Sequence, residues 1–312
     1  MKVLVLESIP QEYKEKLESV AGTDITYTNK NEVTQEQLQQ SEVIIGNPTM
    51  EQLDTCDALQ WLQLSSAGAN TYAAHPKQFT LTNASGAYGV AISEYMLTCT
   101  LNALKHFPEY LHLQSEKVWE NLGHVATISD CTVLVVGMGD IGSAYAKRMK
   151  LLGAKKVIGV RRTLKELPEY YDEQYTFDTM QEALTQSDII ALALPETPET
   201  IHVFNKERLS SCKKGAVLIN VGRGSAIDTE SLITLCKKDH FSSVYLDVFD
   251  HEPVPKNSVL WNTPHLYVTP HIAGRFNAST TVNTAMNIFV KNLQHYVNKE
   301  PLENVVDRTL GY

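Results

Sequence analysis

The chain has 312 residues, with 27 basic and 36 acidic side chains and a formal net charge of −9 at pH 7. This length exceeds what one hydrophobic core usually supports, so we expect two domains. No run of basic residues is present that would neutralise the phosphates of nucleic acid or of an anionic membrane surface. Neither nucleic acid nor a membrane is therefore an expected partner.

The cysteines and the apolar segments indicate the cellular compartment. The five cysteines are widely spaced and form no C-x-x-C pair, which is typical of free thiols in a reducing compartment. The apolar run before Glu7 is too short for the core of a signal peptide, and no later segment is long enough to span a bilayer. We therefore expect a cytoplasmic protein.

Apolar runs recur along the chain, with helical patterns between them. Continuous rather than alternating hydrophobicity predicts strands that are buried on both faces, and intervening helices make neighbouring strands parallel. The sequence thus predicts an α/β protein with two doubly wound parallel sheets. In chain order the runs are KVLVL, EVIIG, CTVLVVG, KVIGV, DIIALAL, AVLINV, SVYLDVF and LYVTP.

Two long helical stretches, at about residues 93–107 and 277–298, are expected to cross between the domains. The turn LESIPQEY after the first strand has no glycine to let a phosphate approach, so the first domain is not the expected nucleotide site. We expect residues 1–100 and 277–312 to form a flavodoxin-like substrate domain. Residues 101–276 are then a Rossmann dinucleotide-binding domain inserted into it.

The segment VLVVGMGDIGSAYAKRM predicts a phosphate-binding turn. Gly137, Gly139 and Gly142 stand in G-x-G-x-x-G spacing between a buried strand and an amphipathic helix. In that setting the glycines allow a tight turn, the approach of a pyrophosphate and the close packing of helix on strand. The helix start, with Asp140 and Ile141, then holds the anion with its amide groups. The alternative interpretation is an ordinary glycine-rich turn.

The strand KVIGV runs into Arg161, Arg162 and Thr163, about 20 residues after Gly142. An NAD enzyme usually carries an acidic residue at this place, to bind the ribose hydroxyl groups. Two guanidinium groups instead favour a 2′-phosphate, which an acid would repel. We therefore expect NADP to be preferred over NAD, with a pair of solvated surface arginines as the alternative.

Three later strand ends carry ionisable residues: Arg223 in INVGRGSAID, Glu252 in LDVFDHEPVP and His271 in YVTPHIAG. In an open α/β sheet such residues converge on one crevice. Reduction of a ketone needs a proton donor near neutral pH, and histidine suits that role. A carboxylate beside it holds the ring, and an arginine can grip a substrate carboxylate through two parallel bonds.

These motifs resemble the D-isomer-specific 2-hydroxyacid dehydrogenase family, in its NADP-using, glyoxylate/hydroxypyruvate reductase-like branch. The resemblance extends over nearly the whole chain, from WLQLSSAGAN through VGMGDIGSAYAKRM, LPETPET and LINVGRG to LDVFDHEP and TPHIAG. It implies that Arg223 binds the substrate, that Glu252 pairs with the histidine, and that His271 gives and takes the proton.

The resemblance also implies roles for residues outside this set. The backbone amides near Ala67 and Gly68 would hold the substrate carboxylate, and Asp247 would contact the nicotinamide carboxamide. Pro195 and Thr197 would line the cofactor, and the protein would be a homodimer. Arg275 and Phe276 follow the catalytic histidine where smaller residues are expected, and they either shape the pocket or belong to the domain junction.

The sequence thus predicts an NADP-dependent reductase that converts a small 2-oxo acid to the D-2-hydroxy acid. An NAD-linked phosphoglycerate or hydroxypyruvate dehydrogenase of the same family is the enzyme alternative. A nucleotide-sensing binding protein without catalysis is the alternative from another class. The remaining histidines show no metal-ligand spacing, so no metal site is expected.

Overall fold

The computed structural model describes residues 1–312, and the chain divides into two compact units. The first unit contains Met1–Tyr88 and Phe276–Tyr312, and the second contains Gly89–Arg275. The expected break after residue 100 falls inside helix α5 (Gly89–Leu104), which packs along α7 (Asp140–Leu151) in the second unit. The first break therefore lies before this helix rather than near its end. None of the helices has the length and apolar character that crossing a membrane requires.

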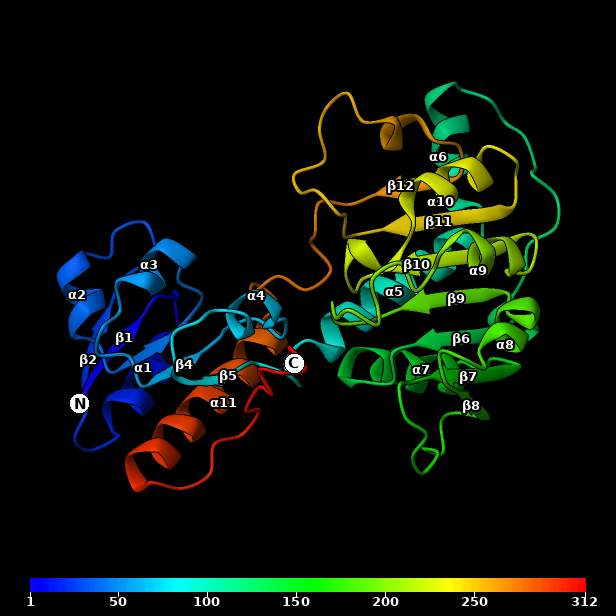
Figure 1. The fold of residues 1–312 in the computed structure, drawn as a ribbon. Helices are drawn as coiled ribbons and strands as arrows, with labels where there is room; N and C mark the ends of the chain where they lie inside the picture. Colours follow the sequence, from blue (N-terminus) through cyan, green and yellow to red (C-terminus); the bar gives the residue numbers. More distant parts are fainter. The chain divides into compact units, whose positions relative to one another are not determined.

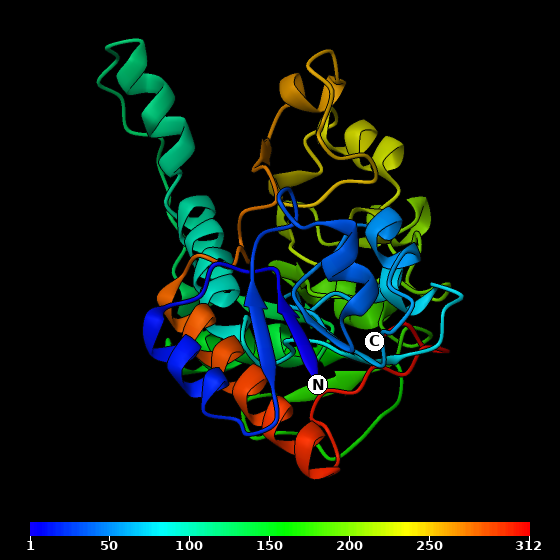
Figure 2. The same ribbon diagram turned by 90° about the vertical axis from the view of Figure 1, so that its left-hand side faces the viewer.

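The first unit is built on a five-stranded parallel sheet with the order β2-β1-β3-β4-β5. This is the flavodoxin-like order, and it has a switch point between β1 and β3. The sheet lies between two layers of helices (Figure 2). Its elements are β1 (Lys2–Val5), α1 (Gln11–Glu18), β2 (Asp24–Tyr27), α2 (Gln35–Gln40), β3 (Val43–Ile45), α3 (Met50–Asp54), β4 (Trp61–Gln63), α4 (Asn70–Ala73), β5 (Thr80–Thr82) and α11 (Ser279–Asn298).

The two faces of this sheet are covered by different helices. Leu4, Ile44 and Leu62 share a buried cluster with residues of α2, α3 and α4. On the other face α11 packs beside α1, and Tyr296 stacks on Trp61 with 5.0 Å between the ring centroids. The C-terminal helix thus completes the core of the N-terminal residues, which explains why the chain returns to this unit.

The second unit is built on a seven-stranded parallel sheet with the order β12-β11-β10-β9-β6-β7-β8. This is the Rossmann order with one strand added at the β11 edge, and the strand order reverses between β6 and β9. Its elements are α5, α6 (Phe107–Ser115), β6 (Thr132–Val136), α7, β7 (Lys156–Val160), β8 (Glu173–Tyr175), α8 (Gln181–Gln186), β9 (Ile189–Leu192), α9 (Lys206–Ser211), β10 (Ala216–Asn220), α10 (Thr229–Cys236), β11 (Phe241–Leu246) and β12 (Leu266–Val268).

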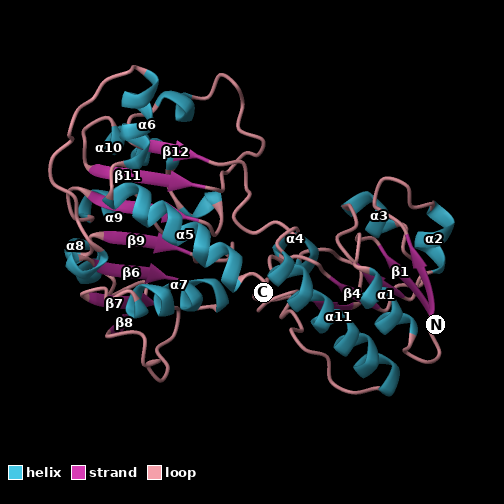
Figure 3. Cartoon of the chain, turned by 180° about the vertical axis from the view of Figure 1, so that it is seen from behind, coloured by secondary structure: helices cyan, strands magenta, loops and turns pink.

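Helices cover both faces of the seven-stranded sheet. Figure 1 shows α8, α9 and α10 in front of the strands, and Figure 3 shows α5 and α7 on the opposite face. The central strands β6, β9 and β10 are buried at every residue. All five cysteines are buried free thiols, as the sequence predicts.

The eight apolar runs of the sequence all form strands, and the predicted fold class is confirmed. Four strands, β2, β4, β5 and β8, do not correspond to any of these runs. Strand β2 lies at a sheet edge and alternates between exposed and half-buried residues, so it has no continuous apolar run. Strand β8 is a three-residue edge strand whose residues are all half-buried, so it too gives no continuous apolar run. Strands β4 and β5 have only three residues each, which is too short for a periodic signal.

Candidate active site

The three glycines of the turn after β6 occupy three different environments. Gly137 has φ +106°, and a Cβ atom there would lie 2.4 Å from the carbonyl oxygen of Ala193. A Cβ atom at Gly142 would lie 1.9 Å from the carbonyl oxygen of Gly137 and 2.9 Å from Val135. A Cβ atom at Gly139 would meet nothing within 4 Å. Two glycines therefore permit close packing, whereas the third leaves open space beside the backbone, which fits the approach of a pyrophosphate.

Helix α7 begins directly at this open space. Its N-cap is Gly139, and no side chain caps the helix. The first turn of a helix has amide groups without intrahelical acceptors, and these attract an anion. Ile141 lies half-buried in this turn, and the carboxylate of Asp140 is directed toward Gly89, where an added Cβ would lie 2.6 Å from Oδ1. Asp140 thus faces the start of α5 within its own unit.

The arginine pair follows strand β7, which lies beside β6. The amide of Gly137 donates to the carbonyl oxygen of Val160 at 2.9 Å, so Arg161 stands next to the glycine turn. The amide of Arg161 donates to Tyr175 at 3.1 Å, and its side chain is half-buried. Arg162 and Thr163 are exposed. All three residues therefore lie at the carboxyl edge of the sheet, near the turn.

The loop after β9 is closed by its own threonines. The hydroxyl of Thr200 donates to the carbonyl oxygen of Pro195 at 2.7 Å and accepts from the amide of Thr197 at 2.8 Å. This loop touches the glycine turn through Ala193, as described above. Pro195 and Thr197 thus lie at the switch point between β6 and β9, where the fold places ligands.

The sequence VGRG after β10 brings neighbouring loops together. A Cβ atom at Gly222 would lie 2.6 Å from the backbone of Leu194, and one at Gly224 would lie 2.0 Å from the carbonyl carbon of Phe249. Only glycine fits at both places, because the clashing atoms belong to the backbone. Arg223, between the glycines, is therefore held between the loops that follow β9 and β11.

The charge of Arg223 is stabilised by two carboxylates. Burial lowers the pKa of its guanidinium, whereas Glu196 and Glu252 raise it. One Nη atom donates to the carbonyl oxygen of Gly222 at 2.8 Å. Glu196 also accepts from the hydroxyl of Ser225 at 2.6 Å, which fixes it beside the same loop. A partly buried guanidinium with fixed neighbours suits the binding of a small carboxylate.

Glu252 and His271 form a direct pair. Nδ1 of His271 lies 2.8 Å from Oε2 of Glu252, and Oε1 of Glu252 accepts from the amide of Phe249 at 2.9 Å. Since a carboxylate only accepts, Nδ1 carries the proton and Nε2 remains for a ligand. The side chain of His271 is 52% exposed, so the ring is reachable from outside.

Asp247 holds the loop that carries His271. Its Oδ1 accepts from the amide of Ile272 at 2.9 Å and from the hydroxyl of Thr269 at 2.6 Å, and its Oδ2 accepts from the amide of Ala273 at 2.9 Å. Asp247 is buried, and one acceptor place remains on Oδ2. His271 itself has φ +50°, a backbone conformation that costs roughly 1 kcal/mol in a non-glycine residue. The clamp by Asp247 keeps this strained loop in place.

A hydrogen-bond chain extends from this clamp to helix α5. The hydroxyl groups of Tyr95 and Thr269 lie 2.6 Å apart. Because the Asp247 carboxylate can only accept, Thr269 donates to it and in turn accepts from Tyr95. Burial raises the pKa of the Tyr95 hydroxyl, which keeps this donor protonated.

Arg275 and Phe276, whose roles the sequence left open, lie in different units. The guanidinium of Arg275 donates to the carbonyl oxygens of His271 at 3.4 Å and Pro270 at 3.3 Å. Phe276 stacks on Phe289 of α11, with 6.4 Å between the ring centroids. Arg275 therefore reinforces the histidine loop, and Phe276 belongs to the junction where the chain re-enters the first unit.

In the first unit, the loop Ser65–Ala69 after β4 turns its carbonyl groups inward. Ser65 accepts from the hydroxyl of Tyr88, Ser66 from the amide of Ala84 at 3.0 Å, and Ala67 from Nδ2 of Asn83 at 2.8 Å. The amides of Ala67 and Gly68 donate no hydrogen bond. Because the C=O and N–H of a trans peptide point in opposite directions, these two amides face away from the residues that hold the carbonyl groups.

The sequence comparisons identify the family. The sequence profile described as D-isomer specific 2-hydroxyacid dehydrogenase, NAD binding domain, matches residues 97–273, which is more than half of the chain. The chain belongs to this family. It is thus an NAD(P)-dependent oxidoreductase of the 2-hydroxyacid dehydrogenase type, with an NAD-binding domain in its second unit.

Three relatives of this dehydrogenase are informative. Glyoxylate/hydroxypyruvate reductase A of Citrobacter koseri is 28% identical over 72% of this chain and 70% of the relative. The 2-hydroxyacid dehydrogenase of Xanthobacter autotrophicus Py2, solved with NADPH and MES, is 28% identical over 100% and 99% of the two chains, with TM-score 0.85. The NADPH-dependent glyoxylate/hydroxypyruvate reductase of Sinorhizobium meliloti, solved with NADP and sulfate, is 25% identical over the same shares, also with TM-score 0.85.

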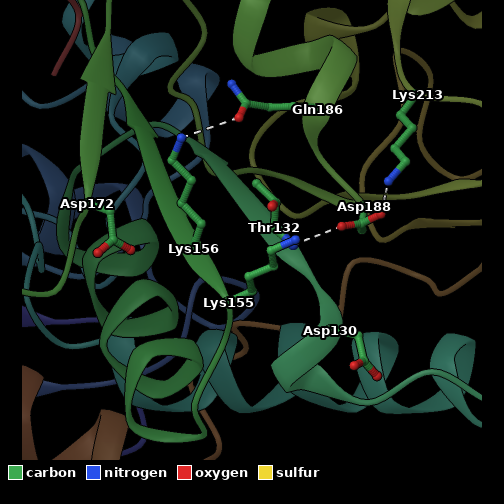
Figure 4. A pocket seen from close by; sticks show the side chains of 8 residues that line it. All are labelled: Asp130, Thr132, Lys155, Lys156, Asp172, Gln186, Asp188 and Lys213. Carbon is green, nitrogen blue, oxygen red and sulfur yellow. Dashed lines mark hydrogen bonds and ion pairs between the residues drawn. The ribbon is translucent and has the colours of Figure 1, made fainter.

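The dehydrogenase also has a polar pocket of about 560 Å³ at the opposite edge of the seven-stranded sheet (Figure 4). It lies where β6 and β7 begin, far along the strands from the glycine turn. Several of its charged groups are in ion pairs. Nζ of Lys213 lies 2.5 Å from Asp188, which also accepts from the amide of Thr132 at 2.8 Å, and Lys156 pairs with Glu173 at 2.6 Å. These contacts join the starts of neighbouring strands, so we assign the pocket a structural role.

The structure therefore brings most of the expected residues of the second unit to one edge of its sheet. The glycine turn, the arginine pair and the Pro195–Thr197 loop follow β6, β7 and β9, whereas Arg223, Glu252 and His271 follow β10, β11 and β12. Ala67 and Gly68 lie in the first unit, at the carboxyl end of β4. No group of three or more histidine, cysteine or acidic side chains is arranged to hold a metal ion.

Proposed function

We propose that this dehydrogenase works as an NADPH-dependent reductase of small 2-oxo acids and forms the D-2-hydroxy acid. The observation that carries the proposal is the pair of Glu252 and His271, 2.8 Å apart, on the sheet edge that also holds Arg223. A proton donor beside a fixed cation suits a substrate that has a carbonyl group next to a carboxylate.

The residues of the chain have distinct tasks in this reaction. When bound, the reduced nicotinamide supplies a hydride to C2 of the substrate, which turns the carbonyl into an alkoxide. Nε2 of His271 gives its proton to that oxygen, so that a neutral hydroxyl group and a neutral imidazole result. Glu252 keeps the ring oriented through Nδ1 and stabilises its positive charge before the transfer. Arg223 binds the substrate carboxylate.

The free amides of the first unit provide a second grip on the substrate. Ala67 and Gly68 have no internal acceptor, and their carbonyl groups are held by other residues. Successive amides that point outward form a site for a carboxylate oxygen. We assign to this loop the binding of the substrate carboxylate.

NADP is the proposed cofactor. Gly139 leaves room for the pyrophosphate, and Gly137 and Gly142 allow the close backbone packing on which a dinucleotide turn depends. Arg161, with Arg162 and Thr163, then binds the 2′-phosphate. The relatives from Xanthobacter autotrophicus and Sinorhizobium meliloti were solved with NADPH and NADP, which supports this preference. Asp247 retains one free acceptor place for the nicotinamide amide group.

Glyoxylate and hydroxypyruvate are the first substrates to test, because they appear in the names of two relatives. The experiment is a matrix of NADPH and NADH against glyoxylate, hydroxypyruvate, and branched and aromatic 2-oxo acids. We expect turnover with NADPH and at least one small 2-oxo acid. Tight NADPH binding without turnover of any of them would favour a nucleotide-sensing protein instead.

We also propose that the enzyme is a homodimer, in which the second copy of the chain covers α6 and the loop after it. Helix α6 buries none of its own residues, and Figure 2 shows it projecting from the rest of its unit. Phe107 and Leu111 are each 53% exposed, and Trp119 is fully exposed. A nine-residue helix is marginal in water without packing, so a second copy is the proposed cover. Sedimentation at the mass of one chain would contradict this.

A further inference from the structure

The last residues of the chain run along the edge of the five-stranded sheet. Val305 forms an antiparallel bridge with Thr82 of β5, and the amide of Val306 donates to the carbonyl oxygen of Leu81 at 2.8 Å. We call residues Asn304–Arg308 the C-terminal strap. The strap lies beside the segments that flank the loop Ser65–Ala69, and it contacts them at both of its ends.

At one end, Asn304 forms hydrogen bonds with the backbone of Asn83 and Ser85. Its Nδ2 donates to Ser85 at 2.8 Å and to Asn83 at 3.4 Å, and its carbonyl oxygen accepts from the amide of Asn83 at 3.2 Å. Asn304 has φ +56°, a conformation in which asparagine is among the tolerated residues. The backbone and the side chain of Asn304 together fix the position of Asn83.

Asn83 transmits this restraint to the loop. Its Nδ2 donates to the carbonyl oxygen of Ala67 at 2.8 Å, and its Oδ1 accepts from the amide of Ser85 at 3.0 Å. The side chain is buried, so it has a single orientation. Because Nδ2 holds the Ala67 carbonyl, the amide of Gly68 in the same peptide is directed the opposite way.

At the other end, Arg308 holds the segment that follows the loop. Helix α4 begins at Asn70, directly after Ala69. The guanidinium of Arg308 lies over the ring of Phe79, with 4.8 Å to the centroid. It donates to four carbonyl oxygens at the end of α4 and in the turn behind it, those of Tyr72, Ala73, His75 and Lys77.

We propose that the C-terminal strap positions the loop Ser65–Ala69 and thereby sets the affinity for the 2-oxo acid, which rests on the proposed role of this loop in substrate binding. The strap fixes the orientation of the Ala67–Gly68 peptide through Asn83 and restrains the exit of the loop through Arg308. Asn304 and Arg308 are positioning residues, because they act on the substrate only through other groups. If the strap is loosened, the amides of Ala67 and Gly68 are still present, but their orientation is no longer fixed.

The test is Asn304→Gly, with Lys299→Gly as the matched control. Both residues have left-handed backbones, with φ +56° and +59°, so glycine keeps the local conformation in each case. Only Asn304 has side-chain bonds to the loop supports. We expect Asn304→Gly to raise KM for the 2-oxo acid about 5- to 30-fold. KM for NADPH should stay unchanged, because the glycine turn belongs to the other unit.

Hydrogen–deuterium exchange provides a readout that does not depend on activity. In Asn304→Gly we expect faster amide exchange over residues 65–77 than in Lys299→Gly, with no change over residues 132–151 of the second unit. Unchanged exchange over residues 65–77 would refute the claim that the strap positions the loop, whatever the activity. Faster exchange with an unchanged KM would also overturn the proposal, because the loop would then not set substrate affinity.

A second variant tests the other end of the strap separately. Arg308→Ala should also raise KM for the 2-oxo acid, and added guanidinium at millimolar concentration should restore it in part by occupying the vacated place between the carbonyl groups. Absence of any 2-oxo acid turnover in the unaltered enzyme would instead refute the proposed function, and the exchange data would still decide whether the strap holds the loop.

Discussion

The carboxyl edges of the two sheets present different chemistry. The edge of the seven-stranded sheet presents charged side chains, with Arg223, Glu252 and His271 on three separate loops. The edge of the five-stranded sheet presents, after β4, a loop of small residues in which the amides of Ala67 and Gly68 are free and the carbonyl groups are tied down. One edge is suited to move a proton, and the other is suited only to hold an anion.

This difference has a consequence for substitutions. A side-chain site is lost when its side chain is removed, whereas a backbone site persists as long as the surrounding contacts keep its orientation. We therefore expect large effects on kcat from single changes in the loops that follow β11 and β12 of the second unit. Changes in the first unit should have smaller effects, and these should appear mainly in KM for the 2-oxo acid.

The largest effect is expected for His271→Ala. Removal of the proton donor should lower kcat by about 10²- to 10⁴-fold, the usual contribution of a general acid. NADPH affinity, measured by fluorescence titration, should change little because the glycine turn is untouched. His251→Ala is the control, since His251 is exposed next to Glu252. A His271→Ala enzyme that keeps most of its rate would remove the proposed role.

Asp247→Asn tests the clamp on the histidine loop. An asparagine has one acceptor oxygen and one donor group, so one of the partners Thr269, Ile272 and Ala273 faces a donor instead of an acceptor. We expect kcat to fall about 10- to 100-fold while KM for NADPH stays within a few fold. A selective rise of KM for NADPH would show instead that contact with the nicotinamide is the main role of Asp247.

Arg161→Asp tests the cofactor preference. We expect the variant to weaken NADPH about 10- to 50-fold, because a charged hydrogen bond to the 2′-phosphate is lost and a repulsion is added. NADH should bind nearly as before. Isothermal titration with both cofactors measures this, and an equal loss for NADPH and NADH would mean that the arginine is only a solvated surface residue.

The smallest effect is expected for Ser66→Ala in the first unit. The hydroxyl of Ser66 donates to the carbonyl oxygen of Gly68 at 2.8 Å, so its loss removes one of several restraints on the loop. We expect KM for the 2-oxo acid to rise about threefold with kcat unchanged, which corresponds to one neutral hydrogen bond. A drop in kcat as large as that of His271→Ala would contradict the division of tasks between the two edges.

The sequence predicts the second unit better than the first for a physical reason. Gly137, Gly139 and Gly142 act within one turn, so their spacing between a buried strand and an amphipathic helix indicates the turn from local sequence. The loop Ser65–Ala69 has no chemically distinctive side chain, and only the resemblance to the family indicated its role. Its supports come from far along the chain: Asn304 binds Ser85, 219 residues away, and Arg308 binds His75, 233 residues away.

The same reasoning explains which residues of the site were missed. Tyr95 contacts Thr269 across 174 residues, and nothing in the local pattern of α5 distinguishes it from other helical tyrosines. Asp247 carried an expected role at the cofactor, but its hydrogen bonds to the histidine loop depend on the pairing of β11 with β12. Local motifs therefore predict ligand turns, whereas contacts between distant loops require the fold.

The most direct measurement of the central claim follows the hydride. NADPH carrying deuterium at the transferable C4 position is mixed with glyoxylate and the enzyme, and the product is analysed by mass spectrometry and NMR. The account predicts glycolate with one deuterium on C2, formed quickly by the unaltered enzyme and only in traces by His271→Ala. Product without deuterium on C2, or equal yields from both enzymes, would contradict it.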